Sequence, residues 1–183
     1  MICSFCNKET VLQPYNGRPN AQCPKCKALE RHRDLGNYIR DVIPEGGTNW
    51  LWVAPINKEI CKALAESKGC TRYNGIDLSG QRGDVMDVQN MSFIDGDFDV
   101  AVCYHVLEHV DDDDQALSEI HRVLKPNGLL LFQVPMGGKV GVMGHKRVYE
   151  KNRLEAWLSD YFYFKIIYDE QGRDYFYVCK KVD

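Results

Sequence analysis

The hydrophobic pattern in the second half of the chain predicts a strand, a helix and a second strand in succession. Residues 100–103 form a short apolar run, which is typical of a strand buried on both faces. Acidic residues at 111–114 then supply carboxylates that cap and begin a helix, whose apolar residues from Ala116 to Leu124 recur on one stripe. Residues 126–128, Pro-Asn-Gly, break this helix, and the apolar run 129–134 predicts the next strand. This unit is half of a doubly wound α/β sheet with a crossover helix.

Weaker forms of the same pattern on both sides of this unit predict the remaining elements. We expect further strands at residues 49–54, 72–78, 84–88, 164–168 and 175–180. Helices are expected at 58–68 and 151–162, and a hairpin turn at 171–174 joins the last two strands. The predicted fold class is α/β, with a Rossmann-like, mostly parallel sheet that ends in an antiparallel hairpin.

Two cysteine pairs near the N-terminus have the spacing of metal ligands. Cys3 and Cys6 form one Cys-x-x-Cys hook, and Cys23 and Cys26 form a second after an interval of 16 residues. Two thiolates in one tight turn face the same ion, and two such turns complete the tetrahedral set that Zn²⁺ prefers. The alternative is two disulfides or four unrelated thiols, which a reducing compartment and this spacing disfavour. We expect a structural zinc ribbon, because four thiolates leave no open position for catalysis.

These signals also predict the domain organisation. The zinc ribbon takes residues 1–30. Leu35, Tyr38 and Ile39 stand at helical intervals and predict a linking helix within residues 31–47, which a Pro and two Gly residues end. The α/β domain then takes residues 48–183.

Composition and charge narrow the classes of protein. A chain of 183 residues with 44% hydrophobic residues has room for one mid-sized domain and a small appendage. The net charge is -3, and residues 1–41 carry seven Lys or Arg against four Asp or Glu, far short of the basic stripe of a dedicated nucleic-acid binder. Apolar runs stay well below the roughly 20 residues that cross a bilayer, and the N-terminus is not signal-like. We therefore expect a cytoplasmic protein that does not bind membranes.

Two short motifs in the central unit carry a resemblance to a known family. Residues 107–110, Leu-Glu-His-Val, and residues 124–128, Leu-Lys-Pro-Asn-Gly, resemble the corresponding segments of class I S-adenosylmethionine-dependent methyltransferases, type 11. The likeness is strong over residues 98–135 and weaker over the rest of the chain from Trp50 to the C-terminus. It implies an enzyme that transfers a methyl group from S-adenosylmethionine, and we expect a small polar molecule as the acceptor.

The first donor-binding residues are expected around the first and second strands of the sheet. In most of the family the turn after the first strand is rich in glycine. Here it reads Ala54-Pro55-Ile56-Asn57, and we expect Ala54 and Pro55 to contact the donor. Asp77 ends the second predicted strand about 20 residues beyond the turn, where a carboxylate accepts hydrogen bonds from both ribose hydroxyls. Leu78 is expected to cover a ring face.

Further site residues are expected at the ends of the next two strands. The resemblance implies that Asp87 accepts from the exocyclic amine of adenine and that Val88 contributes backbone contacts. Tyr104 and His105 lie at the carboxyl end of the fourth predicted strand, beside the topological switch point, so we expect both to be catalytic and Tyr104 also to contact the donor. The alternative for His105 is that it orients the loop, since methyl transfer needs positioning above all.

The glycine-rich segment 136–149 is expected to form a lid over the acceptor. Within it, His145, Arg147 and Tyr149 resemble a His-x-Arg-x-Tyr pattern of a methyltransferase subgroup and are expected to bind the substrate. A role at the start of the following helix is the alternative reading.

Two rival functions stay open on the sequence. The first is an RNA methyltransferase that uses the zinc ribbon to bind RNA. The second is a non-catalytic methyltransferase-like binding protein, because the glycine-free turn at Ala54 and Pro55 departs from the family pattern.

Overall fold

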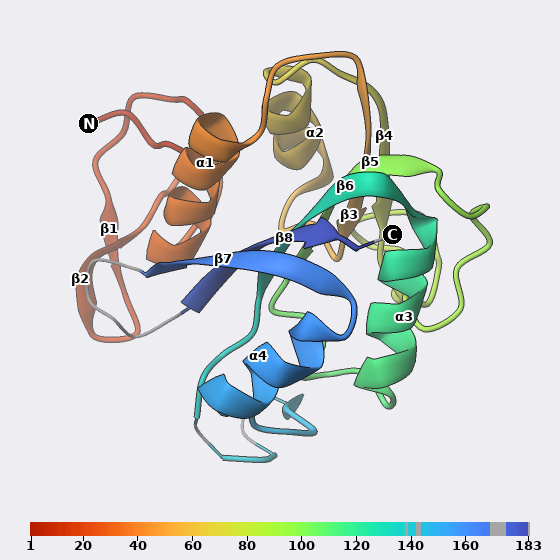
Figure 1. The fold of residues 1–183 in the computed structure, drawn as a ribbon. Helices are drawn as coiled ribbons and strands as arrows, with labels where there is room; N and C mark the ends of the chain where they lie inside the picture. Colours follow the sequence, from red (N-terminus) through yellow and green to blue (C-terminus); the bar gives the residue numbers. More distant parts are fainter. Residues whose placement is uncertain (138, 142–143, 169–174, 183) are drawn as a thin grey trace. The chain divides into compact units, whose positions relative to one another are not determined.

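The computed structural model describes residues 1–137, 139–141, 144–168 and 175–182 (Figure 1). Two compact units are present. One contains residues 1–47 and 56–71, and the other contains residues 48–55 and 72–183. None of the helices in these described segments combines the length and the apolar character that crossing a membrane requires.

The first unit contains a hairpin and two helices. Strands β1 (Gln13–Tyr15) and β2 (Arg18–Gln22) pair antiparallel, and Tyr15 lies opposite Arg18. The two residues between them, Asn16 and Gly17, have φ values of 48° and 75°, as an Asn-Gly hairpin turn requires. Helix α1 (Glu30–Val42) and helix α2 (Lys58–Glu66) follow, and the side chain of Asn57 caps α2 by accepting from the amide of Ile60.

Helix α1 packs closely on the first cysteine loop. A Cβ atom at Gly36 would lie 2.5 Å from the carbonyl oxygen of Ser4, so the helix approaches this loop more closely than a side chain permits. The guanidinium of Arg40 donates to that same carbonyl, and Arg33 donates to the carbonyl of Ala21 at 2.8 Å. His32 accepts from the amide of Leu29 at 3.0 Å and so helps to begin the helix.

The second unit is built on a six-stranded sheet in the order β4-β3-β5-β6-β8-β7 (Figure 1). The strands are β3 (Thr48–Val53), β4 (Cys70–Ile76), β5 (Phe98–Tyr104), β6 (Leu124–Gln133), β7 (Phe162–Tyr168) and β8 (Tyr175–Lys181). Strands β3, β5 and β6 pair parallel, whereas β8 pairs antiparallel with both β6 and β7. The predicted mixed sheet is therefore confirmed, and the predicted turn at 171–174 lies outside the described residues.

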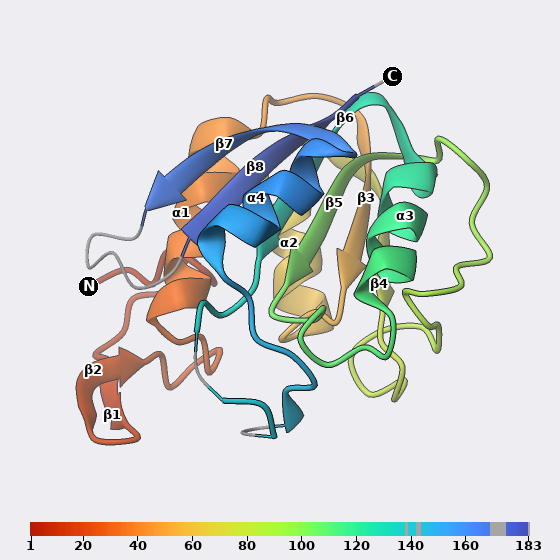
Figure 2. The same cartoon turned by 60° about the horizontal axis from the view of Figure 1, so that its bottom comes forward.

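Helices α3 (Asp113–Val123) and α4 (Lys151–Ser159) lie on the same side of this sheet (Figure 2). They bury their apolar stripes against one face, and the cluster includes Leu51, Val53, Ala101, Cys103, Leu130, Phe132, Tyr177 and Cys179 from the strands. The alternate residues of the central strands are buried as well, among them Trp50, Trp52, Val100, Val102, Leu131 and Phe176. The central strands are thus buried on both faces, as their continuous apolar runs predicted.

The predicted strand at residues 84–88 does not form. Asp84 makes a single bridge to Ile76, and the chain then turns back, because Asp87 pairs with Asn90 three residues further on. Val85 is 74% exposed, so the segment lacks the buried apolar face that would hold a strand in the sheet.

The Pro-Asn-Gly triplet, which was expected to end the helix, lies within the following strand instead. Helix α3 ends at Val123, and β6 already begins at Leu124. Residues 126–128 lie within β6 at a shift in its register with β5, and Asn127 has a φ of 63°. This triplet therefore forms an irregularity in the strand.

Candidate functional site

Three strands of the second unit end close together and form a candidate ligand site. Strand β3 lies between β4 and β5, so the chain leaves β3 toward one neighbour and later returns to the other. The amide of Ala54 donates to the carbonyl of Ile76 at 2.7 Å, which places the ends of β3 and β4 side by side. Open α/β sheets bind ligands at such a switch point, outside the carboxyl ends of the strands.

Ala54 takes a backbone conformation that normally belongs to glycine. Its φ is 49°, in the left-handed region, where a Cβ atom costs about 1–2 kcal/mol. Pro55 is buried, and its ring lies 3.3 Å from the position that a Cβ atom would take at Gly75 in β4. The turn after β3 therefore contains a residue in the left-handed conformation, and this residue is an alanine where a glycine would be usual.

Asp77 follows β4 and presents a buried carboxylate at this edge. Its Oδ2 accepts from the Ser79 hydroxyl at 2.6 Å and from the amide of Arg82 at 3.2 Å, and its Oδ1 lies 3.4 Å from the Arg82 guanidinium. Burial by itself raises the pKa of Asp77, but these hydrogen bonds and the Arg82 charge outweigh it and lower the pKa. Asp77 is therefore ionised at neutral pH, and its loop fixes its orientation.

The second expected acid, Asp87, is held by a glutamine. Its Oδ1 accepts from the backbone amide of Gln89 at 2.9 Å, and both oxygens lie 3.0 Å from the side-chain nitrogen of Gln89. The side-chain oxygen of Gln89 in turn accepts from the amide of Asp112, the N-cap of α3, at 2.7 Å. Val88 is buried, whereas Leu78 is 70% exposed.

Tyr104 and His105 mark the end of β5. Tyr104 is buried, and its ring packs edge-on against the His105 imidazole at 5.1 Å between centroids. His105 has a φ of 54°, so the chain turns sharply directly after the strand. Its Nδ1 lies 3.2 Å from Oε1 of Glu108, and its Nε2 is buried without a hydrogen-bond partner among the described residues.

The structure brings His145, Arg147 and Tyr149 to the β5–α3 connection. The Arg147 guanidinium donates to the carbonyls of Leu107, Val110 and Asp111 at 2.7–2.8 Å. The Tyr149 hydroxyl donates to Oδ2 of Asp113 at 2.8 Å, and burial, followed by this carboxylate, raises the pKa of Tyr149. These two side chains hold the segment in place. Residues 138, 142 and 143 of the predicted lid at 136–149 lie outside the described residues.

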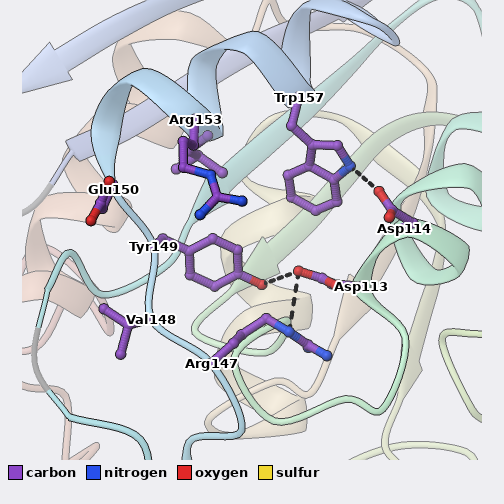
Figure 3. A pocket seen from close by; sticks show the side chains of 9 residues that line it. Asp113, Asp114, Arg147, Val148, Tyr149, Glu150, Arg153 and Trp157 are labelled. Carbon is purple, nitrogen blue, oxygen red and sulfur yellow. Dashed lines mark hydrogen bonds and ion pairs between the residues drawn. The ribbon is translucent and has the colours of Figure 1, made fainter.

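A cavity of about 400 Å³ lies between the start of α3 and α4 (Figure 3). Its lining residues are Asp113, Asp114, Arg147, Val148, Tyr149, Glu150, Arg153, Leu154 and Trp157. Trp157 stacks on Tyr149 with an interplanar angle of 17° and donates to Asp114. Helices α3 and α4 pack on the face of the sheet to which the Cys103 side chain points. Tyr104 follows Cys103 in β5, so its side chain points to the opposite face of the sheet from the cavity.

The four N-terminal cysteines converge on one point of the first unit. The sulfur atoms of Cys3 and Cys26 are 3.8 Å apart and those of Cys6 and Cys23 are 4.0 Å apart, with no disulfide among the described cysteines. Zinc–sulfur bonds of about 2.3 Å in a tetrahedron separate the sulfurs by roughly 3.8 Å. The cluster is therefore consistent with a zinc site.

Both cysteine hooks have the same backbone hydrogen bond and the same left-handed position. The amide of Cys3 donates to the carbonyl of Lys8, and the amide of Cys23 donates to the carbonyl of Ala28, in each case five residues on. The residue after each second cysteine is left-handed, with φ values of 54° at Asn7 and 62° at Lys27. Burial opposes ionisation of Cys23, yet the amides of Cys26 and Lys25 and the neighbouring thiols lower its pKa to about 7. Burial raises the pKa of the Cys6 and Cys26 thiols, so metal binding would have to displace their protons.

Several known proteins are similar to this chain in sequence or in fold. Residues 57–132 match a family model described as "Methyltransferase domain". A 2-methoxy-6-polyprenyl-1,4-benzoquinol methylase, mitochondrial, from Bos taurus is 34% identical over 85 residues, which are 46% of this chain and 24% of that protein. A malonyl-(acyl-carrier protein) O-methyltransferase from Halalkalibacterium halodurans is 29% identical over 122 residues, which are 56% of this chain and 42% of that protein. The chain thus spans less than half of these curated relatives.

Among solved structures, the N-methyltransferase NodS from Bradyrhizobium japonicum WM9, in complex with S-adenosyl-l-homocysteine, has a similar fold. Its TM-score is 0.66 at 15% identity, over 88% of this chain and 93% of that one. At this level of identity the likeness shows the fold, and the predicted α/β architecture is confirmed.

Proposed function

Because the chain carries a class I S-adenosylmethionine-dependent methyltransferase domain, we propose that it transfers a methyl group from S-adenosylmethionine to a small polar acceptor. The observation that carries this proposal is the buried, ionised carboxylate of Asp77, which stands at the end of β4 beside the switch point of the sheet. A carboxylate with two fixed acceptor oxygens matches a pair of adjacent ribose hydroxyls.

In this proposal, each strand end at the switch point binds one part of the donor. Asp77 accepts from the ribose, and Ala54 and Pro55 border the methionine portion. Leu78, Asp87 and Val88 surround the adenine; the 70% exposed side chain of Leu78 is available to cover a ring face. The donor supplies an activated methyl group on its sulfonium.

Tyr104 and His105 are proposed to stand at the reacting end of the donor. The two rings pack against each other directly after β5, and His105 is held by the buried carboxylate of Glu108. If Nδ1 of His105 donates to Glu108, Nε2 carries the free lone pair and is the atom that accepts a proton from the acceptor. His145 is proposed to contact the acceptor, while Arg147 and Tyr149 support it by positioning the segment.

We also propose that the cysteine cluster binds Zn²⁺ in a structural role. The four sulfurs have tetrahedral separations, and four thiolates fill the coordination sphere. The ion would join two loops that are 17 to 23 residues apart in a segment of about 30 residues, too few to form a core of their own.

Calorimetric titration with S-adenosylmethionine and with S-adenosylhomocysteine tests the donor site directly. Binding of both compounds, with the product protecting the protein against thermal unfolding, supports the proposal. Absence of heat and of a thermal shift at about millimolar concentrations, well above a typical cofactor affinity, would instead favour a non-catalytic protein of the same fold. RNA binding that falls steeply with salt would make a nucleic acid the acceptor.

A further inference from the structure

We propose that Glu108, His109 and His145 form a second metal site, for a divalent transition ion such as Zn²⁺. One ligand atom from each of these side chains lies within 4.8 Å of the others. The three residues come from two segments of the same unit, the β5–α3 connection and the segment before α4. A carboxylate and two imidazoles are a donor set that binds zinc and related ions and leaves coordination positions open.

The distances fit a metal with little rearrangement. Nε2 of His109 lies 3.7 Å from Oε1 of Glu108. Metal–nitrogen and metal–oxygen bonds of about 2.1 Å in a tetrahedron place two ligand atoms roughly 3.4 Å apart. The two imidazoles of His109 and His145 already lie edge to face, with their centroids 5.0 Å apart. Side-chain rotations that bring the three ligand atoms from within 4.8 Å to roughly 3.4 Å of one another would complete the site.

One oxygen of the buried Glu108 carboxylate has no partner among the described residues. The Glu108 side chain is 1% exposed, and the oxygen without a hydrogen-bond partner among these residues is Oε2. The groups that face its Oε1 are the imidazoles of His105 and His109, at 3.2 and 3.7 Å. A buried carboxylate is costly unless it is paired or bound to a metal, so an ion bound here would give this carboxylate a partner that it lacks.

The surrounding backbone fixes the ligands before an ion arrives. Nδ1 of His109 lies 3.3 Å from the carbonyl of Gly144, so the ring donates there and leaves Nε2 as the metal-binding atom. The amide of Lys146 donates to the carbonyl of Glu108 at 2.7 Å, which aligns His145 with the other two ligands. His105 also contacts the same carboxylate, with its Nδ1 3.2 Å from Oε1, and so restrains the position of Glu108.

The site would also define the chemistry of the acceptor. Since His105 both follows β5 and touches Glu108, the metal lies next to the proposed reacting end. A three-ligand ion keeps a position for an oxygen or nitrogen atom of a bound molecule. This step rests on the proposed function, and it favours an acceptor with a hydroxyl, carboxylate or similar hard donor beside its reacting atom.

Zinc content and zinc titration of the whole protein test the site. After dialysis against zinc-containing buffer and removal of free ion, His109→Ala and His145→Ala are expected to hold one zinc ion per chain fewer than the unchanged protein. Titration should show binding weakened by more than about 100-fold, since even outer-shell partners cost 10- to 100-fold. The control is Asp111→Asn, which removes a neighbouring acid that pairs with Lys146 without touching a ligand.

Two results would overturn the metal site. They are equal zinc content and affinity in the unchanged protein and in both histidine variants, or an equal loss in the Asp111→Asn control. The measured quantity is the difference in zinc content between variants that all keep the four cysteines, so zinc bound at the cysteine cluster does not affect it. The same samples titrated with S-adenosylhomocysteine report on the proposed function separately, since donor binding needs neither histidine.

Discussion

Arg82 holds the carboxylate of Asp77 from two sides. Its backbone amide donates to Oδ2, and its guanidinium lies beside Oδ1 at 3.4 Å. Because Ser79 also donates to Oδ2, a loop of six residues orients the carboxylate before any ligand is present. Such preorganisation lowers the entropic cost of binding.

Replacing this acid tests its assignment to the ribose. Asp77→Asn is expected to weaken S-adenosylhomocysteine binding by roughly 10- to 150-fold, the effect of losing about 1.5–3 kcal/mol of hydrogen bonding to a charged group. Ser79→Ala is the matched control, because it removes one support of the same carboxylate and keeps the charge; a loss below about tenfold is expected. Calorimetry measures both, and equal affinity of Asp77→Asn and the unchanged protein would refute the assignment.

Gly83 is expected to be essential for the position of the Asp77 loop. A Cβ atom there would lie 2.4 Å from the carbonyl oxygen of Gly75, at the end of β4. Gly83→Ala should therefore lower the free energy of unfolding by about 1–3 kcal/mol, as overpacking does, and weaken donor binding. Gly46→Ala is the control, since nothing lies within 4 Å of its Cβ position. Urea unfolding compares the two variants, and equal stability would contradict this account of the loop.

Removal of one cysteine should release the ion of the N-terminal cluster. Cys26→Ser is expected to lose one zinc ion per chain and to make residues 1–30 sensitive to limited proteolysis, because the metal supplies most of the folding energy of so short a segment. Cys61→Ser removes a buried thiol of the same unit that lies outside the cluster, so its zinc content should not change. Metal analysis of the purified variants would contradict this prediction if both kept the same zinc.

Stability should decrease in mild acid because of His121. Burial lowers its pKa, and the charge of Lys181 lowers it further, against a hydrogen bond to the carbonyl of Val182. The unfolded chain has a histidine pKa of about 6.5, so below that pH the unfolded state binds more protons, and stability is lost as the pH falls toward the folded pKa.

The variant His121→Phe removes this titration and keeps an aromatic ring beside Phe162. The unfolding free energy, measured in urea between about pH 5 and 7 around the ordinary histidine pKa, should then change less with pH than in the unchanged protein. Tyr161→Phe alters the other ring that packs on His121 and should keep the original slope. Identical slopes for His121→Phe and the unchanged protein would exclude this origin.

The central part of the fold was predictable because its signals are local. The apolar run of β5, the acidic N-cap at Asp112 and the stripe of α3 each lie within a few residues, and the structure confirms all three. The cysteine hooks were equally readable, since the ligands of each pair are three positions apart. By contrast, residues 84–88 have strand-like composition, but their pairing depends on whether a distant sheet offers them a buried face.

The parts of the site that the sequence did not disclose depend on long-range contacts. The left-handed conformation of Ala54 is accompanied by a hydrogen bond to Ile76 and by the close approach of Pro55 to Gly75, and no local pattern contains these contacts. Glu108 and His109 stand in the Leu-Glu-His-Val motif, and only the fold brings His145 beside them. The adjacent pair Glu108-His109 was the available sequence signal, and it points to a metal site only once the fold brings a second histidine nearby.

The Arg147 guanidinium joins two regions that are 36 to 40 residues apart in the chain. It closes the turn after β5, so neither that turn nor the segment around His145 opens without the other. Amide protons of both regions should therefore exchange with solvent at a shared rate, as one cooperative unit within the native state. Local opening of the protein would then expose the proposed reacting end and its neighbouring histidines in a single event.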